Sequence, residues 1–311
     1  MMRNPVFESS MKRRMRSWRA PLLITLYGLF LLLVCADALS VMQRTAIKLA
    51  GQRVGLETYI YLSVMQFALI VLVAPALTSG AISGERERQT LDLLLCTRTG
   101  ALRIVVGKLF SSVCFLALML VSSLPMMALV LVFGGVSLGD VLTMFLFLLV
   151  TAFACGAIGI FCSALFKRTV TATVVAYLIL FAVGVGTLLA VFLLSQIDAP
   201  SYYSISSYYS SSLGVIPAAD AAESLPAFPL SAYCLLFNPV FGLFSLLIQH
   251  TGLLERTVGS YGFSVLYQFL AYMEKLAWVS MGVLTACGIL LMLLSALFVK
   301  PVSSRLQRKR K

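Results

Sequence analysis

The chain has 311 residues, of which 60% are hydrophobic and 12% are charged, and its mean hydropathy is +0.97. Soluble domains carry about 25% charged residues, so this composition excludes an ordinary soluble protein. Alternating segments of about 10 residues, which are typical of a transmembrane β-barrel, do not occur. We therefore expect an all-α protein that crosses a membrane several times, and the net charge of +12 must be explained in that setting.

Six apolar runs are each long enough to cross a bilayer, which takes about 18–20 residues of helix. Asp37 is the only charged residue inside them. The first five runs lie within residues 21–196, and the sixth precedes a basic tail at residues 300–311. The six predicted spans are residues 21–41, 58–83, 109–133, 141–166, 169–196 and 276–299.

Lysine and arginine are distributed unevenly between the segments that connect these spans. With a cytoplasmic N-terminus, the cytoplasmic segments hold 19 of the 24 Lys and Arg residues and the external segments hold five. Positively charged flanks stay in the cytoplasm, so both termini are predicted to be cytoplasmic in a multi-pass cell-membrane protein. The positive charge then indicates orientation and contact with anionic lipids, not nucleic-acid binding.

Residues 1–20 contain apolar side chains at helical spacing with basic residues around them. This pattern predicts an amphipathic helix that lies in the membrane interface. A basic flank that only sets the orientation is an alternative, and so is a signal peptide ending near Asp37. The apolar residues of the predicted interfacial helix are Phe7, Met11, Met15 and Trp18.

Residues 197–275 are predicted to be an external loop that begins with a linker at 197–229. Within it, residues 231–249 are apolar, but a seventh crossing would place the basic tail outside. Pro239 removes a backbone donor in the middle of this run and favours a break. We expect a re-entrant or interfacial element around Asn238 and Pro239, with a full span as the alternative. Residues 261–273 form a further external helix or extend the last span.

Charged residues gather in one segment between two apolar runs, "AISGERERQTLDLLLCTRTG" at residues 81–100. At 100° per residue, a helix over residues 84–96 places Glu87 with three leucines (91, 94 and 95) on one face. The other face carries Glu85, Gln89 and Asp92, and Leu93 lies opposite the leucines. We expect the leucines to rest on the helical bundle and the acidic face to meet a partner; a solvated helix without a partner is the alternative.

Chemical groups for catalysis are scarce in the sequence. There is one histidine, His250, and seven scattered cysteines without a CxxC pair, so neither a catalytic pair nor a metal site is indicated. No G-x-x-x-x-G-K-[ST] phosphate loop occurs. Ion-coupled carriers usually hold ionisable residues inside their spans. In this chain the predicted spans contain almost no ionisable residues. A transport function would therefore need an energy source on another chain.

The segment "ISGERERQTLDLLL" resembles the "I-x-x-E-[KR]-E-x-G-T-L-[ED]-x-L-L" signature of ABC-2-type transporter permeases. Two further stretches are similar to that family, "GAIGIFCSALFKRTVTATVVAY" (156–177) and "FNPVFGL" (237–243). In two places the chain departs from the family: Gln89 replaces the usual glycine, and "CTRT" replaces the common "S-T-P". The resemblance covers the chain from the N-terminal helix to the tail.

The resemblance implies an exporter permease with a cytoplasmic coupling helix at residues 84–96 that docks on a separate ATP-binding subunit. ATP and Mg²⁺ would bind to that partner, with no cofactor in this chain, and two permease subunits, identical or paired, would assemble. The alternatives are a membrane anchor or sensor that recruits a cytoplasmic partner, and a membrane-embedded lipid-modifying enzyme. The residues expected to couple to the ATPase are Glu85, Arg86, Glu87, Gln89, Asp92 and Leu93.

Small residues recur every four positions in the fourth predicted span. They are Ala152–Gly156 and Cys155–Gly159–Ser163, and such patterns allow close helix packing in lipid. We expect them to serve packing within the chain, with a subunit interface as the alternative. Gly184 and Gly186 predict a second close approach.

Overall fold

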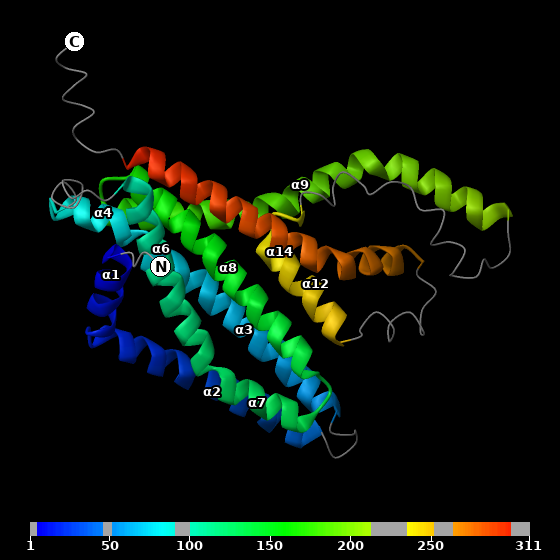
Figure 1. The fold of residues 1–311 in the computed structure, drawn as a ribbon. Helices are drawn as coiled ribbons and strands as arrows, with labels where there is room; N and C mark the ends of the chain where they lie inside the picture. The colour runs from blue at the N-terminus through cyan, green and yellow to red at the C-terminus, as the bar shows by residue number, and fades with distance from the viewer. Residues whose placement is uncertain (1–4, 46–51, 91–99, 213–234, 252–263, 300–311) are drawn as a thin grey trace, which may run out of the picture. The chain divides into compact units, whose positions relative to one another are not determined.

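A computed structural model of the chain describes residues 5–45, 52–90, 100–212, 235–251 and 264–299. All regular secondary structure in these ranges is α-helical (Figure 1). The helices are α1 (Pro5–Met15), α2 (Arg19–Thr45), α3 (Gln52–Thr78), α4 (Gly80–Glu87), α6 (Ala101–Ser122), α7 (Leu124–Phe133), α8 (Leu138–Leu165), α9 (Thr169–Ser212), α12 (Pro239–Thr251) and α14 (Ser264–Phe298).

Six segments of the described ranges are long and apolar enough to cross a membrane. This confirms the six predicted spans. The third comprises α6 and α7, which are separated only by a break at Ser123, and the second comprises α3 and α4. The segments are Ala20–Asp37, Gly55–Glu87, Ala101–Phe133, Leu138–Leu165, Thr169–Ala190 and Ala277–Phe298.

Several helices extend beyond the predicted spans. Helix α6 begins at Ala101 and not at residue 109, because the chain buries Lys108 inside the helix and does not use it as a flank. Helix α9 continues to Ser212, so residues 197–212, predicted as the start of the external linker, are helical. Residues 264–273 are helical and form the first part of α14, whose candidate span begins at Ala277. Residues 213–234 of the predicted linker lie outside the described residues.

The helices divide into two compact units, one of residues 1–180 with 285–311 and the other of residues 181–284. In the first unit α3 packs along α8, and α2, α6 and α7 pack against α3 (Figure 1). Glycines set the distance between α3 and α8, since a Cβ added at Gly159 would lie 2.0 Å from Oγ1 of Thr78. The prediction that the small residues of the fourth span pack within the chain is thus confirmed for Gly159, and Gly156 lies against Leu109 and Thr78 in the same way.

An apolar cluster joins four helices of this first unit at the end where α4 lies. It contains residues of α4, α6 and α8 together with the residue that follows α14. A helix face buried in this way is held by the same packing as a protein interior. The cluster members are Ile82, Val105, Leu109, Val113, Ala157, Ile160, Ala164 and Val299.

The second unit contains the distal part of α9, α12 and the first part of α14. Asn238 precedes α12, and its side-chain amide donates to the Gly184 carbonyl (3.1 Å) and to Oγ1 of Thr187 (2.8 Å) on α9. Its Oδ1 accepts the N–H of Val240 (2.9 Å), so Asn238 caps the helix that Pro239 begins. The close helix approach predicted at Gly184 and Gly186 is not found, because no described atom would lie within 4 Å of a Cβ at either residue.

Candidate functional site

The site is built around α4, which follows α3 after a break at Ser79. Pro75 lies in the last turn of α3, and the N–H of Ser79 still bonds to the Pro75 carbonyl (2.8 Å). The N–H groups of the third and fourth residues of α4 bond to a side chain of another helix. Ile82 and Ser83 both donate from the backbone to Oγ of Ser163 on α8, at 2.8 and 2.9 Å. A hydroxyl of α8 therefore satisfies the donors that a helix start leaves without partners.

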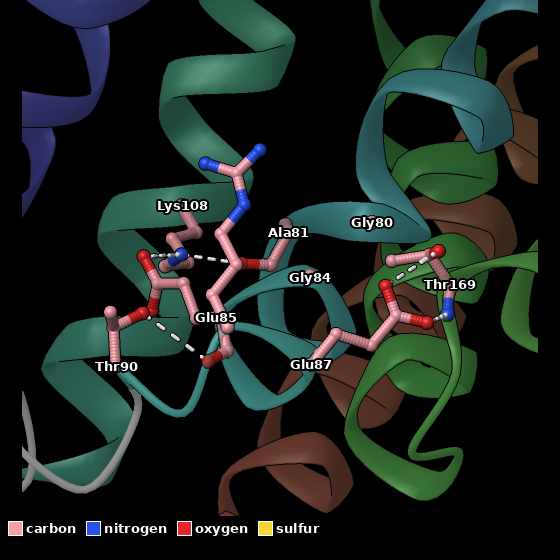
Figure 2. Close-up of a pocket in the computed structure, with 9 residues that line it drawn as sticks. Gly80, Ala81, Gly84, Glu85, Glu87, Thr90, Lys108 and Thr169 are labelled. Atoms are coloured by element: carbon pink, nitrogen blue, oxygen red, sulfur yellow. Dashed lines mark hydrogen bonds and ion pairs between the residues drawn. The ribbon is translucent and has the colours of Figure 1, made fainter.

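Glu85 points from α4 toward α6. Its Oε1 lies 2.5 Å from Nζ of Lys108, and the two side chains are 18% and 8% exposed. Lys108 also donates to the Ala81 carbonyl, one turn earlier on α4 (Figure 2). The second carboxylate oxygen of Glu85, Oε2, is buried and has no hydrogen-bond partner among the described residues. The pair therefore ties α4 to α6 through a largely desolvated ionic contact.

Arg86 points toward the end of α8. Its Nη1 donates to the Ala164 carbonyl (3.2 Å) and to the Phe166 carbonyl (3.4 Å). Helix α8 ends at Leu165, so these carbonyls belong to its last turn and to its C-cap. A cation at this position satisfies carbonyls that have no partner within the helix and interacts favourably with the helix dipole.

Glu87 reaches the start of α9. Its Oε1 accepts the backbone N–H of Thr169 (2.9 Å) and its Oε2 accepts the Thr169 hydroxyl (3.0 Å), as Figure 2 shows. Thr169 is the first residue of α9. A carboxylate at a helix N-terminus bonds unpaired N–H groups and is stabilised by the helix dipole. The three charges in a row, Glu85, Arg86 and Glu87, thus bind three different helices.

Helix α4 ends in a tight left-handed turn. The N–H of Gln89 donates to the Arg86 carbonyl (3.1 Å) and the N–H of Thr90 to the Glu85 carbonyl (2.9 Å). Gln89 has φ of 56°, and it is the one non-glycine residue with positive φ in the described ranges. These features define a Schellman motif, whose left-handed position is usually glycine. The departure noted in the sequence, glutamine in place of glycine, therefore falls on the residue that must adopt this conformation.

The prediction of one continuous helix over residues 84–96 is wrong, because α4 ends at Glu87 and the chain turns at Gln89. The predicted acidic face fails for the same reason, since it assumed that Glu85 and Gln89 share a helix. Glu85 turns into the protein and not toward a partner. Asp92 and Leu93 lie outside the described residues.

A cavity of about 570 Å³ lies beside α4. Two glycines of α4, Gly80 and Gly84, form part of its wall, and Thr169 of α9 lies against both. Charged side chains line it as well, as Figure 2 shows. The lining residues are Gly80, Ala81, Gly84, Glu85, Glu87, Arg88, Thr90, Lys108 and Thr169.

Sequence reasoning missed three residues of this site: Lys108, Ser163 and Thr169. Lys108 looked like the positive flank of a span, and Ser163 looked like a packing residue. The available signal was the position of Lys108, which would place a positive charge inside an otherwise apolar helical run. A buried cation requires an anionic partner, and the preceding charged segment offered three candidates, Glu85, Glu87 and Asp92.

The predicted interfacial helix is shorter than expected. Helix α1 ends at Met15, and Trp18 lies in the turn before α2 with 81% of its surface exposed. Trp18 is therefore not on the same helical face as Phe7 and Met11. Glu8 and Lys12 form an ion pair on α1 at 2.9 Å.

The predicted break at Pro239 agrees with the start of α12 at that residue. Helix α12 has 13 residues, which gives a length of about 20 Å. The hydrocarbon core of a bilayer is about 30 Å thick, so α12 is too short to cross it alone. Within the described part of the chain, no group of three or more His, Cys, Asp or Glu side chains is placed to hold a metal ion.

Comparison with known protein families gives a match over most of the chain. Residues 40–297 match the model of a family described as ABC-2 family transporter protein. The matched range contains α4, α12 and four of the six candidate spans, together with all but the final residue of the last span. No curated protein matches the chain.

Proposed function

The chain belongs to the ABC-2 family of transporter proteins, and from this premise we propose that it is the permease subunit of an exporter whose separate ATPase subunit docks beside α4. The family is that of a membrane transport subunit, and the six apolar helices agree with a multi-pass membrane protein. In the proposal both termini face the cytoplasm of a cell membrane, since most Lys and Arg residues then lie inside. ATP and Mg²⁺ bind to the partner, and this chain uses no cofactor.

The observation that carries the proposal is the set of contacts made by Glu85, Arg86 and Glu87. Glu85 binds α6 through Lys108, Arg86 binds the end of α8, and Glu87 binds the start of α9. A displacement of α4 therefore either moves all three helices or breaks charge-assisted hydrogen bonds. Hydrogen bonds to charged groups are worth about 1.5–3 kcal/mol each. Because breaking them costs free energy, the three helices are favoured to move together with α4.

In the proposed mechanism, ATP binding draws two ATPase subunits together, and each subunit pushes on the α4 of its own permease subunit. Because Glu85, Arg86 and Glu87 bind α6, α8 and α9, the push reaches three spans at one end. Two permease subunits assemble in this mechanism, and the pathway opens outward between or within them. Ser163 keeps α4 aligned, because its hydroxyl binds the first turn of α4 from α8.

The experiment co-expresses the tagged full chain with each ABC ATP-binding subunit of its source organism in turn. Complexes are purified and reconstituted in vesicles, and ATP hydrolysis is compared with that of the ATPase alone. We expect one subunit to bind and to change its hydrolysis rate in the complex. In Glu87→Ala the contact to Thr169 is lost, so binding should persist while the change in rate falls several-fold. Glu57→Ala, an exposed carboxylate near the start of α3, is the matched control.

Two outcomes would contradict the proposal. If no ATP-binding subunit binds the wild-type chain, the chain is not coupled to an ATPase. If one binds but its hydrolysis is the same with and without the chain, the chain serves as a membrane anchor or sensor for that subunit.

A further inference from the structure

We infer that the surface next to α4 is cationic and that it takes an acidic surface of the ATPase subunit. The inference rests on the proposed function and reverses the sign that the sequence predicted for this contact. Of the acidic residues that the helical pattern assigned to the partner, Glu85 is used inside the chain and Asp92 lies outside the described residues, whereas exposed basic residues lie beside α4.

The two carboxylates of α4 are both engaged. Glu85 is 18% exposed and is paired with Lys108, so its charge is compensated inside the chain. Glu87 is exposed, but both of its oxygens accept hydrogen bonds from Thr169 at the N-terminus of α9. The positive end of the α9 dipole thus compensates the second carboxylate. Neither acid offers a free carboxylate to a partner.

Three exposed cations surround these engaged groups: Arg88, Lys167 and Arg168. In the described part of the chain none of them forms an ion pair. They lie near one another, because Arg88 follows Glu87 directly, Arg168 precedes Thr169 directly, and Glu87 is bonded to Thr169. Arg88 also lines the cavity of about 570 Å³. We call Arg88, Lys167 and Arg168 the basic rim.

The neighbouring residues outside the described ranges do not change this balance. Residues 91–99 contain one acid, Asp92, and one base, Arg98. The formal net charge of residues 91–99 is therefore zero. Among the described residues beside α4 the uncompensated charges are therefore positive, and opposite charges across an interface favour fast association and specific pairing.

The location of the basic rim favours a protein over a lipid headgroup as its partner. Helix α8 has 28 residues, a length of about 42 Å. A bilayer with its headgroups measures about 40–45 Å, so a helix of this length reaches the outer limit of the headgroups. Lys167 and Arg168 follow the end of α8, and Arg88 is one of the residues that line the cavity beside α4. Because Arg88 lines a cavity, a folded partner with a projecting acidic side chain can reach it, which a flat lipid layer cannot do.

The test uses the full permease in nanodiscs and the ATPase subunit identified by the co-expression experiment. Affinity is measured at several salt concentrations for the wild type, Arg88→Glu, Arg168→Glu and the double variant. An exposed charge contact is worth about 0.2–1 kcal/mol, which is roughly a 1.4- to 5-fold change in affinity. We expect the double variant to bind roughly 10-fold more weakly and to lose most of the salt dependence.

Two controls separate the basic rim from other effects. Arg88→Gln removes the charge without placing an acid at the C-terminal end of α4, where a negative charge is unfavourable. Arg16→Glu changes an exposed cation after α1 by the same two units of charge and should leave the affinity unchanged. Each variant is checked for wild-type thermal unfolding before titration.

The outcomes are distinct from those of the proposed function. If the wild type binds an ATPase and the double variant binds it equally well, the inference is wrong while the proposed function stands. If the loss appears only in nanodiscs with anionic lipid, or equally in Arg16→Glu, the cations act on lipid and the inference is wrong. If the double variant binds more tightly, the partner surface is basic.

Discussion

The ion pair between Glu85 and Lys108 predicts that Glu85 contributes to the stability of the chain. The sequence alone had assigned Glu85 to the binding of a partner. Removing one member of a buried pair leaves the other charge without compensation, which costs about 3–5 kcal/mol. Lys108 keeps the Ala81 carbonyl as an acceptor, and Glu85 is 18% exposed, so the lower end of this range applies. We expect Glu85→Met and Lys108→Met each to lower the free energy of unfolding by about 3 kcal/mol.

The double variant should behave differently. With both charges replaced by methionine, no buried charge is left, and apolar replacement of a buried pair is often neutral. We expect Glu85→Met/Lys108→Met to lose only about 1 kcal/mol, whereas independent effects would total about 6 kcal/mol. This large coupling is the signature of a direct, desolvated contact.

Unfolding by SDS titration in mixed micelles, followed by far-UV circular dichroism, measures these free energies for the purified chain. ATPase binding should then be compared only among variants that are folded at the assay temperature. If the double variant loses as much stability as the two single variants combined, Glu85 and Lys108 do not interact. If Glu85→Met unfolds like the wild type but fails to bind the ATPase, Glu85 faces the partner after all.

Three further predictions concern single residues. Gln89→Gly should stabilise the chain by about 1 kcal/mol in the same titration, because glycine adopts φ of 56° without strain; a loss of stability would contradict the Schellman turn. Gly159→Ala should lower the unfolding temperature strongly, because its Cβ would lie 2.0 Å from Oγ1 of Thr78, whereas Gly28→Ala, with no described atom within 4 Å of its Cβ, should not. Gln66→Leu should raise the free energy of unfolding by about 1–3 kcal/mol, because both amide atoms of this buried side chain lack partners among the described residues; a decrease would show that the amide is satisfied.

The spans could be predicted from the sequence because their physical cause is local. An apolar run of sufficient length forms a helix in lipid whatever its neighbours are, since every backbone group must be satisfied within the segment. Pro239 likewise marked a helix start through its missing N–H. The ends of the helices could not be predicted in two places. Lys108 is charged but lies inside α6, and the polar residues 197–212 are still part of α9.

The position of the candidate site in the sequence could be predicted, but the contacts of its side chains could not. The segment of Glu85 to Gln89 was identified by its charges, and its role was assigned from a helical wheel. A wheel assumes that the helix continues, but Gln89 takes a left-handed conformation and the helix ends. The partners of Arg86 and Glu87 lie about 80 residues later in the chain, so no local pattern could show which helices they bind.

The contacts of the Ser163 hydroxyl determine when, during synthesis of the chain, α4 can be fixed in place. It accepts N–H groups of residues that precede it by 80 and 81 positions, and Thr169 follows Glu87 by 82. When residues 52–87 leave the ribosome, the groups that hold α4 do not yet exist. Helix α4 can be fixed in place only after the fourth span and the start of the fifth have been synthesised. An ATPase subunit that recognises the assembled end would therefore bind no nascent chain shorter than about 170 residues, so recruitment itself would report that the first half of the permease is complete.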